Sequence, residues 1–318
     1  MRTRIPFALL AATLASSLFC VSAHARARVF VASYGDDANP CTFLSPCRNF
    51  QQAVNVADAG GEVTAIDSAG FGPINITKAV TITSPDGVEA GVVPTAGGDA
   101  IDINAGFTDA VVLHGLTLNG SGVGSNGIYF KSGGNLTISN CNIHNFTGNG
   151  ILIAPTSPGI LNFVVTNTTV SDNGNVGLYY LPTGGGATTH GVIDHVVASN
   201  NQFGIVLDDS GGGAAVVAIA NSIASNNVLS GIALGTVSSP LGVSIDNTSV
   251  NNNPGNGISA GTNTPNSLSV LLGRSVITGN EVGVLIEGVA KVSTYQNNQI
   301  NSNSEDVFPG TLTPTTLR

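Results

Sequence analysis

A short strand pattern that begins with glycine returns seven times along the middle of this 318-residue chain. Successive units start 23, 27, 27, 27, 26 and 26 residues apart. The glycines that open them are Gly127, Gly150, Gly177, Gly204, Gly231, Gly257 and Gly283. A unit this short cannot bury its own apolar face, so the regular period predicts a solenoid whose coils stack into one core. We expect each glycine where the backbone turns sharply and a Cβ would clash.

Two columns of polar residues keep the same period. In the first, an asparagine follows a β-branched residue by three positions; its members are Asn173, Asn200, Asn226, Asn253, Asn280 and Asn303. The second lies earlier in each unit and consists of Asn140, Asn167, Asp194, Asn221, Asn247, Arg274 and Asn297. Asparagine adopts left-handed backbone angles at turns, and stacked amide side chains form ladders. We therefore expect both columns at the corners of the coils.

These patterns predict an all-β fold, a right-handed parallel β-helix of about nine or ten coils with a short N-terminal capping helix. The chain has 41 Gly, no Trp and 42% hydrophobic residues, which fits many turns around an aliphatic core. The periods of hexapeptide solenoids and of calcium-binding nonapeptide repeats are absent from the sequence, and a propeller blade needs about 40 residues. Right-handed crossovers are the rule between parallel strands.

The first 25 residues have the pattern of a secretory signal peptide. Arg2 and Arg4 precede an apolar stretch over residues 6–21, and small residues flank His24 before the expected cleavage site after Ala25. We expect the mature chain to be exported, either secreted or periplasmic.

The mature chain divides into three predicted parts. Residues 26–62 are expected to form an N-terminal cap, 63–304 the β-helix, and 305–318 a C-terminal cap or tail. Apolar residues at helical spacing between Arg48 and Ala57 predict a short amphipathic helix over the open end of the solenoid.

Three cysteines lie beyond the signal peptide. Cys41 and Cys47 bracket a short loop that contains proline. We predict a disulfide between them, because an oxidising compartment favours it and two thiolates without a third nearby ligand bind zinc poorly. Cys141 falls inside a repeat and is expected to be a small buried apolar residue.

The charge balance excludes two classes of partner. The formal net charge is −9, with 10 Lys and Arg against 19 Asp and Glu. Binding to nucleic acid or to anionic lipid needs clustered basic residues. We therefore expect no nucleic-acid partner and no docking on anionic lipid. No segment after the signal peptide is apolar and long enough to span a bilayer, so we expect no membrane insertion. No cofactor is expected, with calcium alone left open, and the oligomeric state also stays open.

The entry to the repeats carries a family resemblance. The segments VASYGDDANPC (31–41), PCR (46–48), GGE (60–62) and PINITK (73–78) resemble the start of exported bacterial proteins with right-handed β-helix repeats, of the pectate-lyase-like superfamily. The resemblance covers nearly the whole mature chain and implies this fold and an extracellular setting. Members of the superfamily include polysaccharide lyases, glycoside hydrolases, epimerases and adhesins, so the fold leaves the activity open.

Candidate catalytic residues are few. Lyases of this superfamily use a basic residue as the base, but Lys131 and Arg274 fall in different columns, many coils apart. Hydrolases carry paired aspartates, and Asp208 and Asp209 directly follow a glycine-led strand, with Asp194 one strand earlier. We take Asp194, Asp208 and Asp209 as the catalytic candidates, and Asp208 with Asp209 as a candidate calcium site. Ordinary turn chemistry accounts equally for all three residues.

Three functions stay open on the sequence. The preferred hypothesis is an exported β-helix that binds or presents a surface to extracellular glycans or cell-surface material, without catalysis. The second is a polysaccharide-active enzyme, a glycoside hydrolase rather than a polyuronate lyase, because the acidic chain would repel a polyanion. The third is a structural component of the cell envelope or extracellular matrix.

Overall fold

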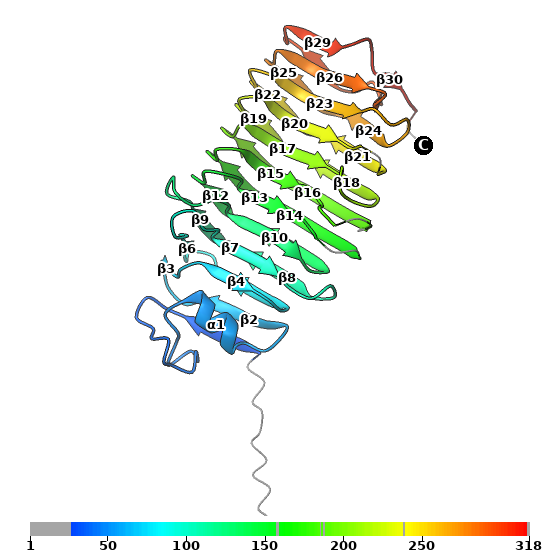
Figure 1. Ribbon diagram of the computed structural model, residues 1–318. Coiled ribbons are helices and arrows are strands. Elements are labelled where there is room, and N and C mark those ends of the chain that lie inside the picture. The colour runs from blue at the N-terminus through cyan, green and yellow to red at the C-terminus, as the bar shows by residue number, and fades with distance from the viewer. Residues whose placement is uncertain (1–26, 157–158, 185, 187, 238, 317–318) are drawn as a thin grey trace, which may run out of the picture.

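The chain forms one elongated solenoid of parallel strands (Figure 1). The computed structural model describes residues 27–156, 159–184, 186, 188–237 and 239–316, so the predicted signal peptide lies outside the described residues. A typical complete coil contributes three strands that pair in parallel with their counterparts in the next coil. In two coils, two of these strands are joined into one long strand. The predicted all-β parallel solenoid is confirmed, and its coils bury a continuous core of Val, Ile, Leu and Phe.

One side of the solenoid is a ten-stranded parallel sheet that contains the glycine-led strands. Its strands are β4 (Ile74–Ile76), β7 (Ile101–Asn104), β10 (Ile128–Ser132), β13 (Ile151–Ile153), β15 (Val176–Tyr180), β17 (Phe203–Asp208), β20 (Ser230–Gly235), β23 (Asn256–Thr262), β26 (Val282–Gly288) and β29 (Glu305–Phe308). One strand per coil agrees with the predicted nine or ten coils.

The other sides belong to a 20-stranded sheet made of two ladders, which share the long strands β14 (Ile160–Ser171) and β16 (Thr188–Ser199). The first ladder also contains β1 (Arg28–Val31), β2 (Gly61–Ala65), β5 (Val80–Thr83), β8 (Ala110–His114), β11 (Asn135–Ser139), β18 (Ala215–Ala220), β21 (Leu241–Asp246), β24 (Leu268–Gly273), β27 (Lys291–Thr294) and β30 (Thr313–Pro314). The second contains β3 (Ala69–Gly70), β6 (Ala90–Val92), β9 (Leu116–Asn119), β12 (Asn142–His144), β19 (Ile223–Ser225), β22 (Ser249–Asn251), β25 (Val276–Thr278) and β28 (Gln299–Asn301). Parallel pairing thus extends beyond both ends of the range 63–304.

A short helix, α1 (Phe50–Val56), lies at the N-terminal end of the solenoid (Figure 1). Phe50, Ala53 and Val54 are buried, as their helical spacing predicts. The Gln51 side chain pairs with the edge strand β4: its Oε1 accepts from the Asn75 amide at 2.7 Å and its Nε2 donates to the Asn75 carbonyl at 3.3 Å. The helix therefore covers a sheet edge that would otherwise offer free backbone groups. The described part of the chain contains no helix long and apolar enough to cross a bilayer.

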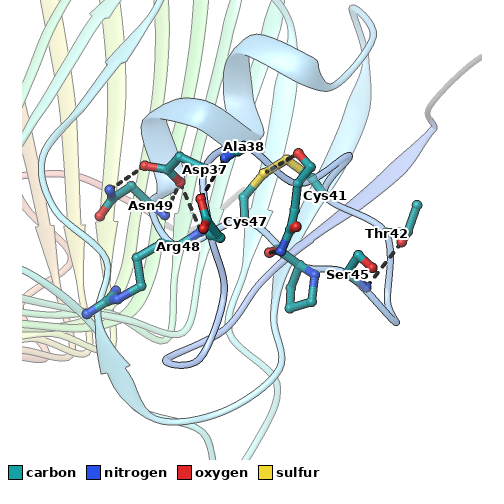
Figure 2. The surroundings of a disulfide bond; sticks show 11 residues. Asp37, Ala38, Cys41, Thr42, Ser45, Cys47, Arg48 and Asn49 are labelled. Carbon is teal, nitrogen blue, oxygen red and sulfur yellow. Dashed lines mark hydrogen bonds between the residues drawn. A yellow bond between two sulfur atoms is a disulfide. The ribbon is translucent and has the colours of Figure 1, made fainter.

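The predicted disulfide between Cys41 and Cys47 is present and braces the segment before α1 (Figure 2). Beside it, the Asp37 carboxylate accepts hydrogen bonds from the backbone amides of Arg48 and Asn49, both at 2.9 Å. These bonds fix the backbone of the two residues that directly precede α1.

The repeated glycines are required by close approach rather than by backbone angles. None of the seven has a positive φ, so no left-handed conformation requires them, but the predicted Cβ clash is confirmed. A Cβ on Gly177 would lie 2.6 Å from the carbonyl oxygen of Gly204 and 2.9 Å from the side-chain nitrogen Nδ2 of Asn201. Successive coils therefore touch where only glycine fits.

A buried asparagine ladder runs behind these glycines. In this ladder the backbone N–H and the side-chain Nδ2 of each asparagine both donate to Oδ1 of the asparagine in the next coil. Its members are Asn173, Asn201, Asn227, Asn253, Asn280 and Asn303. In two coils the prediction is wrong by one residue: Asn201 and Asn227 belong to the ladder, not the predicted Asn200 and Asn226. The predicted residues instead adopt left-handed angles at the corner, with φ of 58° and 57°. The marker failed there because the buried strand positions are Ala198 and Ala224, not β-branched residues.

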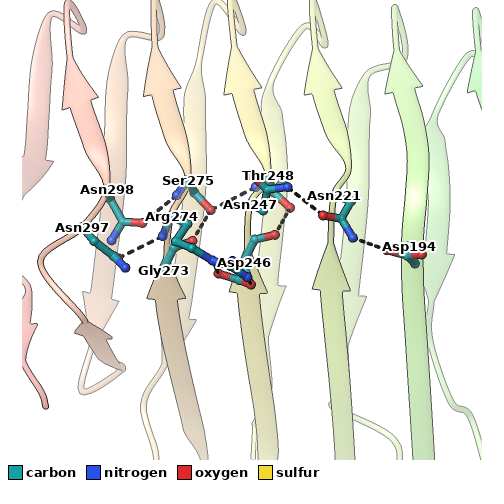
Figure 3. A network of polar contacts seen from close by, with 10 residues as sticks. All are labelled: Asp194, Asn221, Asp246, Asn247, Thr248, Gly273, Arg274, Ser275, Asn297 and Asn298. Carbon is teal, nitrogen blue, oxygen red and sulfur yellow. Dashed lines mark hydrogen bonds and ion pairs between the residues drawn. The ribbon is translucent and has the colours of Figure 1, made fainter. Parts of the chain in front are cut away.

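The second polar column turns the outer corner between the two ladders (Figure 3). Asn140, Asn167, Asn221, Asn247 and Arg274 all have φ between 46° and 55°. In two coils the column residue differs from the prediction: His195 (φ 53°) replaces Asp194, and Gln296 (φ 61°) replaces Asn297. Asp194 instead lies within β16 and pairs in register with Ala220, the last residue of β18.

Cys141 occupies a column of hydroxyl residues at this corner. Thr168 and Ser222 each donate to the carbonyl two residues earlier, at 2.8 and 2.7 Å, and the Cys141 thiol lies 3.3 Å from the Ser139 carbonyl in the same way. The thiol is buried, as predicted, and burial raises its pKa to about 11.

Cys141→Ser should therefore preserve the native fold and change the free energy of unfolding by less than about 1 kcal/mol, because serine takes the hydrogen bond of its column. In the native protein Cys141 should not react with Ellman's reagent at neutral pH, since its thiolate is scarce and inaccessible. Rapid labelling without denaturant would contradict this placement of the thiol.

Candidate functional site

An open groove of about 710 Å³ runs across the outer face of β17, β20, β23 and β26. Two rows of residues, each in register from strand to strand, form its floor. Val206, Ala233 and Ser259 make the first row. Asp208, Gly235, Gly261 and Glu287 make the second row, at the ends of the four strands.

The hollow exists because two adjacent positions of the second row carry no side chain. A Cβ on Gly235 would meet no atom nearer than the Gly261 carbonyl oxygen, at 4.0 Å. A Cβ on Gly261 would lie 3.3 Å from Oε2 of Glu287. Larger residues at either position would therefore project into the groove instead of clashing with backbone.

Polar side chains of the turns that follow the strands form one rim. The Thr236 hydroxyl donates to the Ser239 carbonyl at 2.8 Å, and the Thr262 hydroxyl lies 2.7 Å from that of Ser267. The Thr264 hydroxyl donates to the Val237 carbonyl one coil earlier. These bonds tie the turns together, so the rim is preorganised.

The two carboxylates of the groove lie toward its ends. Oδ1 of Asp208 accepts from the Ser210 amide at 3.0 Å and from the Ser210 hydroxyl. Glu287 lies three strands further along the row, roughly 14 Å by strand spacing. Its side chain leans back over Gly261, which leaves roughly 10 Å, about two strand spacings, between its carboxylate and the Asp208 position.

Asp209 faces the interior rather than the groove. Its side chain is fully buried; Oδ1 accepts from the Tyr180 hydroxyl at 3.4 Å, and Oδ2 has no partner within the described residues. The Tyr180 hydroxyl also lies 2.9 Å from the Thr189 hydroxyl. Burial raises the pKa of Asp209 to about 7, and the negative charge of Asp208 adds to that rise, while the Tyr180 hydrogen bond opposes it.

The structure does not bring the three candidate aspartates together. Asp209 lies beside Thr189, whereas Asp194 is five residues further along β16, roughly 16 Å away at the rise of a strand. Asp194 accepts from the Asn221 side chain at 2.7 Å and lies 2.8 Å from Nδ1 of His195, and these contacts lower its pKa. It therefore belongs to the polar corner of Figure 3.

The basic residues considered for a lyase are already paired, Lys131 with Asp102 and Arg274 with Asp246. No group of three His, Cys, Asp or Glu side chains that could hold a metal ion occurs among the described residues. Asp208 and Asp209 also face different environments, one the groove and one the core, so they do not form a shared calcium site here.

The glycines of the groove were not predicted as functional from the sequence. Their signal is present: outward positions that carry Lys131 and Leu181 in earlier coils become Gly235 and Gly261 in two successive coils. Two missing side chains side by side on an outer face produce a hollow. The rim could not be predicted in the same way, since it depends on how the turns fold.

Comparisons with known proteins agree with this architecture. Residues 104–247 match the family model described as a right-handed β-helix region. The crystal structure of pectate lyase Pel9A is similar with a TM-score of 0.55 at 16% identity, covering 89% of this chain and 81% of that one. The A-module of the Azotobacter vinelandii mannuronan C-5 epimerase AlgE4 has a TM-score of 0.48 at 13% identity, covering 81% of this chain and 91% of that one. No curated protein matches the chain. By its repeats, its ladders, the family-model match over residues 104–247 and the likeness to pectate lyase Pel9A, the chain has the fold of a right-handed parallel β-helix.

Proposed function

We propose that this protein is exported and binds an extended glycan, from the extracellular medium or a cell surface, in the groove over β17, β20, β23 and β26. The observation that supports this most is the shape of the groove: an open trough crossing four strands in succession, with small residues on its floor. An extended polymer can lie in such a trough along the solenoid axis and meet one new coil every ~4.8 Å.

The chemistry of the lining suits sugar rings. Val206 and Val237 offer apolar contacts for the C–H faces of a ring, while Asn263 and the serine and threonine hydroxyls offer partners for its hydroxyl groups. Binding sites commonly combine an apolar surface with a few placed polar groups in this way. Because the rim is already tied by hydrogen bonds, little ordering should be needed on binding.

Binding without hydrolysis fits the carboxylates better. Inverting glycoside hydrolases place their two carboxyl groups about 6.5–9.5 Å apart, and retaining ones about 5–5.5 Å. Asp209 is buried away from the groove and Asp194 is on another face, so neither can pair with Asp208 there. Glu287 lies roughly 10 Å from the Asp208 position, at the upper limit of the inverting spacing. A purely structural role would instead predict self-association without a soluble ligand.

Gly235→Phe should abolish glycan binding and leave the fold intact, because its Cβ would meet no atom closer than 4.0 Å and its ring would project into the groove. Gly242→Phe is the matched control: it lies on β21 of the same coil, and its Cβ would also meet nothing closer than 4.0 Å. Both variants and the wild type would be tested by calorimetry on a panel of neutral, cationic and anionic oligosaccharides, with melting temperatures measured in parallel.

The proposal holds if an oligosaccharide binds the wild type and Gly242→Phe but not Gly235→Phe. It fails if no oligosaccharide binds the wild type, or if Gly235→Phe binds as well as the control does. Release of reducing ends during the same incubations would instead support the glycoside hydrolase hypothesis.

A further inference from the structure

The groove carries negative charge with no basic residue among the described residues that line it. Among the described residues that line it, Asp208 and Glu287 are the charged ones, and both are acidic. The Glu287 carboxylate makes no hydrogen bond or ion pair in the described part of the chain, and Asp208 keeps Oδ2 free of a protein donor. The cation in the same row, Lys131, lies three strands from Asp208 and is paired with Asp102.

The two carboxylates are spread along the trough rather than clustered. With the Glu287 side chain lying over Gly261, roughly two strand spacings, about 10 Å, separate its carboxylate from the Asp208 position. That separation exceeds what one bound ion could bridge. It does suit two charged substituents on different sugar residues of one oligosaccharide.

An aromatic side chain adjoins the Asp208 end. Tyr179 lies in register with Val206 of the groove floor and is half-buried. Burial raises the pKa of Tyr179, and the negative charge of nearby Asp208 adds to the rise. The first row of the groove floor therefore continues into an aromatic residue at the Asp208 end.

We propose that the groove selects amine-bearing glycans, such as oligosaccharides of glucosamine, whose ammonium groups pair with Asp208 and Glu287. This rests on the proposed function, since it concerns the same groove. A polyuronate would bring its carboxylates against both residues in a chain of net charge −9 and should be repelled. A neutral sugar would leave both carboxylates unpaired on binding and should bind less tightly than the amine.

The test compares three ligands of equal length by calorimetry at mildly acidic pH: a β-1,4-linked glucosamine hexamer, its fully N-acetylated form, and an oligogalacturonate. The first two share a backbone and differ only in charge. Wild type should prefer the amine form roughly tenfold or more, as expected for charge-assisted bonds at a partly exposed site. The preference should shrink as salt is added.

The double variant Asp208→Asn with Glu287→Gln should lose this preference while retaining its melting temperature. Asp58→Asn with Asp86→Asn is the control: it removes the same charge from two exposed residues outside the groove lining, and it should keep the preference. The inference is overturned if the acetylated hexamer or the oligogalacturonate binds as well as the amine form, or if the double variant still discriminates. Groove-dependent binding without discrimination would leave the proposed function standing, whereas no binding of any ligand would end both.

Discussion

Asn227→Ala is expected to lower the free energy of unfolding by about 3–5 kcal/mol, since it leaves several buried polar groups without partners. Asn227 is fully buried. Its Oδ1 accepts from the backbone amide and the side chain of Asn201, at 3.1 and 3.2 Å. Its Nδ2 donates to the Ala198 carbonyl and to Asn253, both at 3.1 Å. Alanine replaces none of these bonds.

Asn226→Gly is the matched control for this substitution. Asn226 is the preceding residue, is exposed and has a φ of 57°, which glycine adopts readily. Its change in stability should stay within about 1 kcal/mol. Denaturant titrations of both variants measure the difference; equal midpoints would mean that the asparagine ladder adds little to the stability of the solenoid.

The second large effect depends on pH and concerns Asp209. Its carboxyl has a pKa of about 7 in the folded protein, against about 3.9 in an unfolded chain. The folded state therefore holds this proton more tightly. Its contribution to stability falls as the pH rises from about 4 to 7, and the full cost of a buried charge is present above pH 7.

Asp209→Asn removes that ionisation and keeps a side chain of the same shape. At pH 8 the variant should be more stable than the wild type by roughly 2–4 kcal/mol, because three pKa units correspond to about 4 kcal/mol at most. At pH 4 the two should be nearly equal. Denaturant midpoints at both pH values measure this, with the exposed-residue variant Asp86→Asn as control; a variant equally stable or less stable at pH 8 would show that Asp209 is not held as a buried acid.

The period alone predicted most of the fold. The glycine-led strands follow from the period, because a solenoid repeats its environment in every coil. The capping helix followed instead from the helical spacing of apolar residues between Arg48 and Ala57, and the disulfide from the expected oxidising compartment. Errors arose where one coil departs from the rest. Ala198 and Ala224 fill buried positions that the pattern assigned to β-branched residues, and His195 turns a corner assigned to Asp194.

The candidate site depended on what sequence spacing does not show. Asp208 and Asp209 are adjacent in sequence, yet one lines the groove and the other is buried against Tyr180, since neighbouring residues of a strand face opposite sides. The lean of Glu287 over Gly261 depends on the absence of a side chain in the neighbouring coil. Such contacts between coils require the register, which only the structure supplies.

Amide hydrogen exchange with and without a saturating oligosaccharide tests the central claim, that ligand lies in the groove over β17 to β26. The ends of β20 and β23 and the turns that follow them, at residues 235–237 and 261–264, line the groove and should exchange more slowly when the ligand is bound. The outer corner around Asn221 and Asn247, on another side of the coil (Figure 3), should not change. Protection at that corner instead, or ligand binding that leaves both groove turns unchanged, would contradict the account.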